Sequence, residues 1–284
     1  MNQPTWLWPN GKRIAVIFNV CLEAWSDGKA PGISPMGNPL PAVPGIIDTM
    51  AVSWAAYGVK RGIYRLLHAL ERHGAKSSVM TCAIIAERSP EAVKAVADAG
   101  HEILSHSYAM DVIPLMLSEE EERKNITRCT ELLQKASGKP VRGWLSPRGT
   151  SGPKSPRFLA EAGYLWHGDV FDDDLPYVQD FGGRKIVAIP LGTDVNDMPS
   201  MKYGNPPAMM LESFNQNIEV AQQSGELSII DVTCHAHIFG HPRGAYFYSK
   251  IVEAAARCKD VWIARRIDIA NHVLAQEQTP KSRS

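Results

Sequence analysis

The sequence predicts an α/β fold, a single TIM-like barrel of parallel strands connected by helices. Strand-like and helix-like runs alternate about seven times along the 284 residues, which is typical of βαβ units. The run Arg13–Cys21 is almost continuously apolar and β-branched, as expected for a parallel strand covered on both faces. Polar residues repeatedly follow the strands, at the ends where barrels carry their chemistry. A doubly wound open sheet is the alternative fold.

The predicted helices have recognisable ends. The run Gly62–His73 has its leucines on one face and stops before a glycine, which is a common helix C-terminal signal. Ser118 precedes three glutamates, and this pattern predicts the N-terminus of a long helix over Ser118–Ser137. Further helices are expected at Ser89–Gly100, Pro156–Gly163, Pro207–Ser224 and Lys250–Lys259, and strands at Ser77–Ile85, Glu102–Leu104, Val141–Trp144, Tyr164–Trp166, Lys185–Pro190, Leu227–Cys234 and Val261–Ala264.

One domain, residues 1–275, accounts for this pattern. Within it, Ser26–Gly58 is a long connection with five prolines between Pro31 and Pro44. Structureless segments of this length inside compact domains are usually functional or disordered, so a lid, a subunit contact and a mobile insertion all stay open. The polar residues 276–284 are expected to form a disordered tail.

Composition excludes several classes of protein. With 30 basic and 30 acidic residues the formal net charge is zero, which argues against a dedicated partner among nucleic acids or anionic membranes. No apolar run reaches the length of a membrane span, and Met1–Lys12 lacks the apolar stretch of a secretory signal. Five cysteines without a CxxC pair indicate reduced thiols, so a cytoplasmic protein is expected. Glycine-rich phosphate-binding motifs and a G-x-S-x-G nucleophile motif are also missing from the sequence.

The residue types at the strand ends leave three chemistries open. Glu23 follows the first strand, and His106 and His235 follow later ones. A glutamate and two histidines can bind a divalent metal that activates water. A histidine and an arginine, such as Arg148, can instead stabilise an oxyanion without a metal. Cys21 with a histidine is a possible nucleophilic pair, although a small core cysteine is the plainer interpretation.

Several stretches resemble the polysaccharide deacetylase superfamily, carbohydrate esterase family four. They are R-G-I-Y-R-L-L-H-A-L-E-R-H-G-A-K-S-S and A-E-R-S-P-E-A-V-K-A-V-A-D-A-G-H-E-I-L-S-H-S, of which G-H-E-I-L-S-H is the most specific part. Within the superfamily the chain resembles the allantoinase and cyclic-imide hydrolase branch, through Y-G-V-K-R-G, D-V-F-D-D-D-L-P-Y, I-P-L-G-T-D-V-N-D-M and V-W-I-A-R-R-I-D-I-A-N-H. The resemblance implies a (β/α)7-type barrel, hydrolysis of amide bonds with a divalent metal, and a homo-oligomer.

The family pattern also assigns roles to residues, with departures. Its aspartate pair after the first strand corresponds to Cys21 and Glu23, and its second metal-binding histidine corresponds to Met110. Methionine is too soft and neutral to replace histidine as a zinc ligand. The resemblance therefore implies Glu23 and His106 as metal ligands, with zinc held weakly or not at all, unless Asp111 substitutes. The late catalytic histidine of the family corresponds to His235.

From these assignments the sequence predicts a hydrolase of non-peptide C–N bonds in a small cyclic ureide, imide or similar amide. Glu23 and His106 hold the attacking water, and His235 is the general acid. A metal-dependent N-acetyl (poly)saccharide deacetylase and a catalytically degenerate barrel that binds a ligand are the alternatives. The predicted substrate contacts are Cys21, Arg148, Asp174, Asn196, Asp197 and Arg266.

Overall fold

The computed structural model describes residue 4 and residues 6–36, 40, 41 and 43–278. Its centre is a curled sheet in the order β6-β7-β5-β4-β3-β2-β1-β9-β8, with β10 beside the first half of β1. Every strand pair is parallel except β6 and β7, which form an antiparallel hairpin. The strands are β1 (Ile14–Leu22), β2 (Ser78–Thr81), β3 (Glu102–Ser105), β4 (Gly143–Trp144), β5 (Trp166–His167), β6 (Tyr177–Asp180), β7 (Lys185–Ala188), β8 (Val195–Asn196), β9 (Ser228–His235) and β10 (Val261–Ala264).

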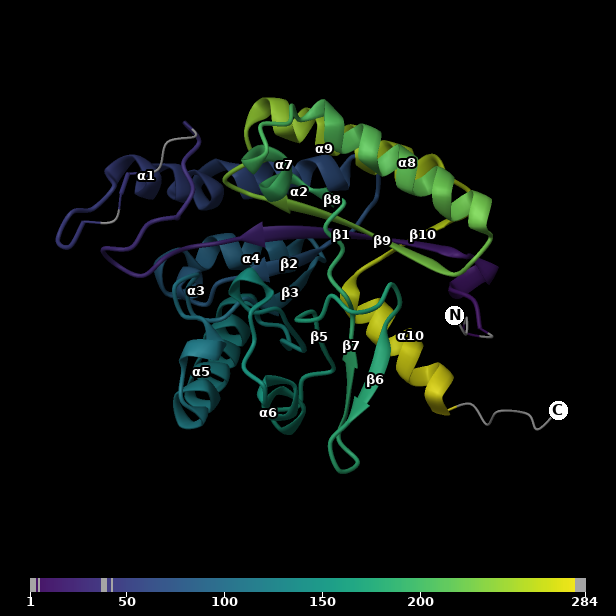
Figure 1. Cartoon of the computed structure of the whole chain (residues 1–284), viewed down its shortest axis with the longest axis horizontal. Coiled ribbons are helices and arrows are strands. Elements are labelled where there is room, and N and C mark those ends of the chain that lie inside the picture. The colour runs from purple at the N-terminus through teal and green to yellow at the C-terminus, as the bar shows by residue number, and fades with distance from the viewer. Residues whose placement is uncertain (1–3, 5, 37–39, 42, 279–284) are drawn as a thin grey trace.

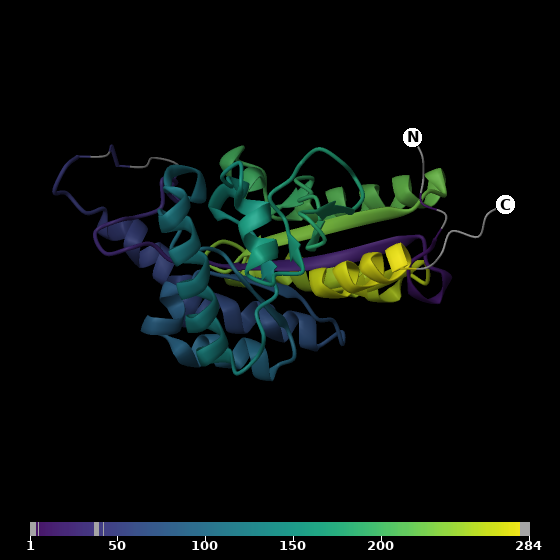
Figure 2. The same cartoon turned by 90° about the horizontal axis from the view of Figure 1, so that it is seen from below.

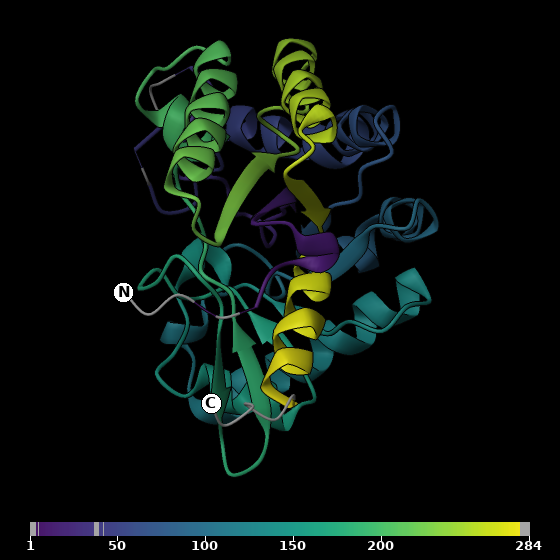
Figure 3. The same cartoon turned by 90° about the vertical axis from the view of Figure 1, so that its right-hand side faces the viewer.

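Helices cover the outside of this sheet. In Figure 1, α2, α7, α8 and α9 lie above the layer of β1 and β9, and α3 to α6 lie below it. Figure 3 shows α8 and α9 side by side over the same strands. The helices are α1 (Thr49–Tyr57), α2 (Ile63–Glu71), α3 (Ile84–Arg88), α4 (Pro90–Asp98), α5 (Glu119–Ser137), α6 (Ser155–Glu161), α7 (Asp197–Lys202), α8 (Ala208–Ser224), α9 (Pro242–Arg257) and α10 (Arg266–Gln278), with short 3₁₀ turns at Pro9–Gly11, Pro114–Met116 and Pro147–Gly149 and a π-helical turn at Gly58–Gly62.

The predicted barrel class is confirmed, in the form of a half-barrel. The sheet ladder ends at β6 on one side and β8 on the other, and these strands do not pair with each other in the described part of the chain. No helix among the described residues is long and apolar enough to cross a membrane.

Alternation along β1 decides which side chains enter the barrel. All nine residues of β1 are buried. Ile14, Val16 and Phe18 pack under the helices, whereas Ala15 and Ile17 pack inside the curled sheet. Because side chains alternate between the two faces of a strand, the odd-numbered positions point inward, and Cys21 continues this series.

The long helix α5 forms as predicted. The Ser118 hydroxyl accepts from the Glu121 backbone N–H, and the Glu121 carboxylate accepts from the Ser118 N–H at 2.8 Å, which is a capping box. Gly138 ends the helix with φ of 67°, a left-handed conformation that glycine adopts without steric cost.

Three segments differ from the sequence-based expectation. The strand expected at Ser77–Ile85 stops at Thr81, and α3 follows it. The connection Ser26–Gly58 contains α1, capped by the Asp48 side chain, so its last third is helical. Helix α10 extends to Gln278, three residues into the predicted tail, and residues 279–284 lie outside the described part of the chain. Figure 2 shows α10 at the opposite end of the molecule from α1.

Candidate active site

Glu23 lies at the centre of the candidate site, at the end of the sheet toward which β1 and β9 both point (Figure 1). Its side chain is 3% exposed, and its two oxygens face three imidazole rings. Oε1 is 3.5 Å from Nε2 of His106 and 3.5 Å from Nε2 of His235, while Oε2 is 3.9 Å from Nε2 of His237. The ends of β3 and β9 therefore converge on one carboxylate at the end of β1.

The imidazoles keep Glu23 ionised. Burial disfavours the charged form, but the positive charge of His235 and the contact with His106 outweigh it and lower the pKa of Glu23 to about 2. Glu23 is thus a carboxylate at neutral pH, and it contributes an acceptor and a fixed negative charge.

His235 is held by Asp197, which is fully buried. One oxygen of Asp197 accepts from Nδ1 of His235 at 2.6 Å, and the other accepts from the backbone N–H groups of His235 and Phe239. Burial opposes a charge on the imidazole, but the acidic groups around it, Cys21, Glu23 and Asp197, raise the pKa of His235 well above its ordinary value. Both ring nitrogens of His235 face carboxylates, an arrangement that favours the doubly protonated ring.

His106 places its Nε2 atom beside the same carboxylate. Its Nδ1 lies 2.6 Å from the Leu145 carbonyl oxygen, which only accepts, so Nδ1 carries the proton. In the neutral ring Nε2 is then an acceptor, and it faces Oε1 of Glu23. Two acceptors 3.5 Å apart create a position suited to a group with two O–H donors, such as water.

Cys21 adds a sulfur to this cluster. It is paired in register with His235 across β1 and β9, and its Sγ contacts Sδ of Met80 at 3.4 Å. Burial raises the pKa of the Cys21 thiol. Among the described residues, the possible ligand atoms of Cys21, Glu23 and His235 all lie within 4.8 Å of one another.

A cavity of ≈ 420 Å³ opens above these groups. Cys21, Glu23, His106 and His235 line it at the strand ends. Arg148 lines its mouth, where the side chain is exposed and the backbone has φ of 61°. A left-handed conformation in a non-glycine residue costs free energy, and such positions gather at functional sites.

The family model for polysaccharide deacetylases matches residues 56–166. A putative polysaccharide deacetylase of Schizosaccharomyces pombe is 24% identical over 299 residues, covering 93% of this chain and 91% of that protein. Residues 56–166 therefore resemble a polysaccharide deacetylase domain.

Solved structures resemble nearly the whole chain. The crystal structure of PuuE allantoinase has a TM-score of 0.86 and 27% identity, and the match covers 96% of this chain and 94% of that one. A putative polysaccharide deacetylase from Mycobacterium smegmatis has a TM-score of 0.82 and 29% identity, with 98% and 96% covered. The recognised superfamily, including its resemblance to an allantoinase, is thereby confirmed.

The donor groups of the candidate site fit a divalent metal poorly. A thiol must lose its proton to become a ligand, and burial raises the pKa of Cys21. Met110 lines the cavity, but its thioether is a soft, neutral donor. Asp111 is not a substitute, because its carboxylate accepts from the backbone N–H of Ser26 at 2.8 Å and does not line the cavity.

Three predicted substrate contacts lie elsewhere in the structure. The guanidinium of Arg266 is fully buried in the barrel, where it pairs with Asp231 and donates to Asn19. Asp197 holds His235 and does not line the cavity. Asp174 is exposed and lines a separate groove, described below. Asn196 lines the cavity, with its Oδ1 accepting from the Met198 N–H at the start of α7.

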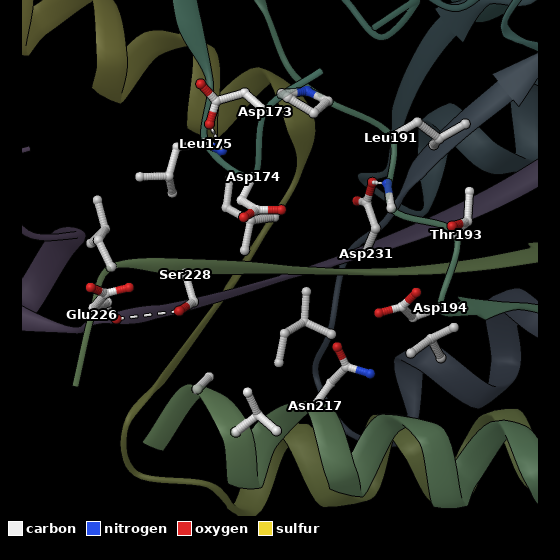
Figure 4. A pocket seen from close by; sticks show the side chains of 18 of the residues that line it. Asp173, Asp174, Leu175, Leu191, Thr193, Asp194, Asn217, Glu226, Ser228 and Asp231 are labelled. Carbon is white, nitrogen blue, oxygen red and sulfur yellow. Dashed lines mark hydrogen bonds between the residues drawn. The ribbon is translucent and has the colours of Figure 1, made fainter. Parts of the chain in front are cut away.

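Asp174 belongs to a larger groove of ≈ 740 Å³ along α8 (Figure 4). Its acidic residues include Asp173, Asp194 and Glu226, all of them exposed. None of the residues around Glu23 lines this groove. Phe171, Leu191 and Thr193 line both spaces, but Asp174 itself does not line the cavity, so its role in orienting a substrate at Glu23 stays a prediction.

Sequence reasoning assigned no role to His237. It is 1% exposed, and neither ring nitrogen has a hydrogen-bond partner among the described residues. Its ring packs edge-on against Trp54 at 4.7 Å and Trp25 at 5.9 Å, and burial lowers its pKa to about 4. The H-A-H sequence at the end of β9 is the sequence signal that could have pointed to His237.

The Y-G-V-K-R-G stretch explains how the His235–His237 segment is positioned. It forms the π-helical turn Gly58–Gly62, which packs directly on the backbone of residues 236–240. A Cβ atom at Gly62 would lie 1.8 Å from the Ala236 carbonyl oxygen, so only glycine permits this approach. Single π-helical turns often occur at functional sites.

Proposed function

We propose that this protein hydrolyses a C–N bond in a small cyclic ureide, imide or similar amide. One observation carries the proposal: an ionised, buried carboxylate lies between the Nε2 atoms of two histidines, His106 and His235, each 3.5 Å from Oε1. The cavity of ≈ 420 Å³ suits a single small molecule. The similarity to PuuE allantoinase supports a ring amide as the substrate class.

In this mechanism Glu23 and His106 position the attacking water. The water donates one hydrogen to Glu23 Oε1 and the other to Nε2 of His106. A carboxylate with a pKa of about 2 is a weak base, so Nε2 of His106 accepts the proton as the oxygen attacks the carbonyl carbon.

His235 then supplies the proton to the leaving nitrogen. Its pKa is raised by the surrounding acidic groups, so its Nε2 carries a proton at neutral pH. Asp197 stabilises the cation and keeps the ring in place. Return of the proton from His106 to His235 completes the cycle.

Arg148 and Asn196 supply the substrate contacts. The described residues include no hydrogen-bond or ion-pair partner for the Arg148 guanidinium, which leaves it available at the mouth to a substrate carbonyl or carboxylate. The Asn196 side chain lines the opposite part of the cavity and can orient a ring N–H or carbonyl group.

A metal-dependent N-acetyl deacetylase is the second candidate. The Cys21–Glu23–His235 cluster favours it, because three ligand atoms already converge within 4.8 Å. A catalytically degenerate barrel that binds a ligand is the third.

Elemental analysis of the purified protein, with a hydrolysis screen before and after chelation, separates these candidates. We expect less than stoichiometric metal and turnover of cyclic ureides or imides that survives chelation. His235→Ala should abolish this turnover, whereas His68→Ala, at an exposed histidine of α2, should not. About one metal per chain with chelator-sensitive deacetylation would support the second candidate, and no turnover of either class the third.

We also propose that the protein is a cytoplasmic homo-oligomer. The segment before α1 exposes several apolar side chains, including Val43, Ile46 and Ile47, and contiguous apolar surface marks interfaces. Analytical ultracentrifugation is expected to show a dimer or larger assembly, and replacing Ile46 and Ile47 with serine should weaken it. A wild-type monomer at micromolar concentration would contradict the proposal.

A further inference from the structure

We propose that the substrate carries an apolar group, an aryl or branched alkyl substituent, on its amide or imide ring. This inference rests on the proposed function, because it names the kind of molecule that the cavity at Glu23 accepts. It goes beyond a bare ureide ring or an N-acetyl sugar, both of which are polar on every side.

The walls of the cavity are the first observation. The titratable groups Cys21, Glu23, His106 and His235 are confined to the strand ends. Away from them the wall is hydrocarbon and thioether, from β2, from the segments after β1, β3, β4 and β7, and from α7. These wall residues are Trp25, Met80, Met110, Leu145, Leu191 and Met198.

Few polar groups remain for a ligand that is polar on every side. Besides the titratable groups, the cavity offers Thr193, Asn196, Thr233 and, at its mouth, Arg148. The Oδ1 atom of Asn196 already accepts from the Met198 N–H. A polyhydroxylated ring would bury several groups against Met80 and Leu145 without partners, and unsatisfied buried polar groups weaken binding.

The volume of the cavity also supports a substituted ring. A water molecule takes up about 30 Å³ in the liquid, so ≈ 420 Å³ is space for more than an unsubstituted five-membered ring. Once the amide is at Glu23, the rest of the ligand lies along the apolar wall.

Three methionines make that wall suited to an aromatic ring. Met80, Met110 and Met198 have flexible, polarisable side chains that adapt to irregular ligands and make favourable contacts with aromatic edges. Trp25 adds an aromatic surface beside Glu23, and it also lines a second, mainly apolar cavity of ≈ 330 Å³ on the side of α1. Apolar space therefore continues around Trp25.

The test compares the binding of hydantoin and 5-benzylhydantoin to the Glu23→Gln variant by isothermal titration calorimetry. This variant is expected to hydrolyse at least about a hundredfold more slowly, so calorimetry reports binding rather than the proposed chemistry. Burial of the phenyl ring is expected to make 5-benzylhydantoin bind at least tenfold more tightly. Equal affinities, tighter binding of hydantoin, or no binding of either compound would overturn the inference.

A matched pair of variants locates the effect. Adding Met110→Gln, at a half-buried residue of the cavity wall, should reduce the preference for the benzyl compound at least threefold. Met116→Gln is the same change at a residue that is 78% exposed and outside the cavity, and it should leave the preference unchanged. Met198→Gln provides a second cavity variant if Met110→Gln unfolds, as judged by circular dichroism. A preference that survives both cavity variants would contradict the assignment.

A wrong hydrolase assignment and a wrong ligand class give different results in this experiment. If wild-type protein hydrolyses neither compound while the Glu23→Gln variant still prefers 5-benzylhydantoin, the hydrolase assignment is wrong and the ligand class stands. If hydrolysis occurs without the preference, the ligand class is wrong and the hydrolase assignment stands.

Discussion

The cavity at Glu23 and the groove along α8 differ in a way that supports the cavity as the functional region. The groove is larger, ≈ 740 Å³ against ≈ 420 Å³, and has more carboxylates. Its acidic residues Asp173, Asp174 and Asp194 are exposed, so water screens them from one another. At Glu23 the charged groups are buried and face each other within 4 Å, where electrostatic interactions are strong. Volume is thus a poorer guide to function than the convergence of buried titratable groups.

The most direct test of this difference is to remove one carboxylate from each region. Glu23→Gln is expected to lower kcat/KM by roughly 10²–10⁴-fold, because the water loses its ionised acceptor. Asp174→Asn, in the groove, should change kcat/KM by less than about twofold, as expected for a surface substitution. Both are measured by steady-state hydrolysis of a cyclic amide. A larger loss of kcat/KM in Asp174→Asn than in Glu23→Gln would place the active site in the groove.

A second prediction concerns Arg266, whose buried guanidinium pairs with Asp231, a residue that also lines the groove. Arg266→Met leaves Asp231 buried without its cation, and breaking a buried pair in this way costs about 3–5 kcal/mol of unfolding free energy. Urea denaturation measures it. Arg157→Met, in an exposed pair with Glu161, is the matched control and should cost less than about 1 kcal/mol. A raised KM with unchanged stability would restore the substrate-clamp role of Arg266.

The pH dependence of hydrolysis tests the role of Asp197. Asp197 raises the pKa of His235, and the general acid works only while His235 is protonated. Activity is therefore present below that pKa and lost as pH rises through it. Asp197→Asn removes the negative charge, so the alkaline limb of kcat should shift to lower pH, with kcat reduced roughly tenfold or more at neutral pH. An unshifted limb would show that Asp197 has only a structural role.

The smallest expected effects concern Arg148 at the mouth of the cavity. Arg148→Gly removes the charge, and we expect KM to rise roughly fivefold, the loss of one exposed charged contact of about 1 kcal/mol. The same change relieves the left-handed backbone at φ of 61°, so the unfolding free energy should fall little or rise by up to about 1 kcal/mol. Arg148→Gln keeps the strain and should raise KM alone. An unchanged KM in both variants would exclude Arg148 from substrate binding.

Much of the fold follows from local patterns in the sequence. The apolar run before Cys21 forms β1, and the cap at Ser118 and the glycine at Gly138 bound α5. The strand ends that carry Glu23, His106 and His235 meet, because parallel strands of one sheet end at the same edge.

Arg266 shows where such reasoning fails. A charged residue after a strand is ordinarily exposed, so the sequence favoured a substrate contact. Its burial depends on Asn19 and Asp231, 247 and 35 residues away, which satisfy the guanidinium inside the barrel. Helix α1 within the proline-rich connection was missed because its apolar side chains have no clear helical face, and its packing beside the π-helical turn stabilises it.

The sequence by itself determined most of the strands, the ends of helices such as α5 and the residue types of the candidate site, because these depend on local periodicity, capping and composition. Only the tertiary structure decided which polar residues face Glu23. In the structure Asp197 contacts His235, Asp174 is exposed to solvent and Arg266 is buried in the core. The physical reason is that a buried charge is stable only beside partners of opposite charge or complementary hydrogen bonding, and those partners are distant in the chain.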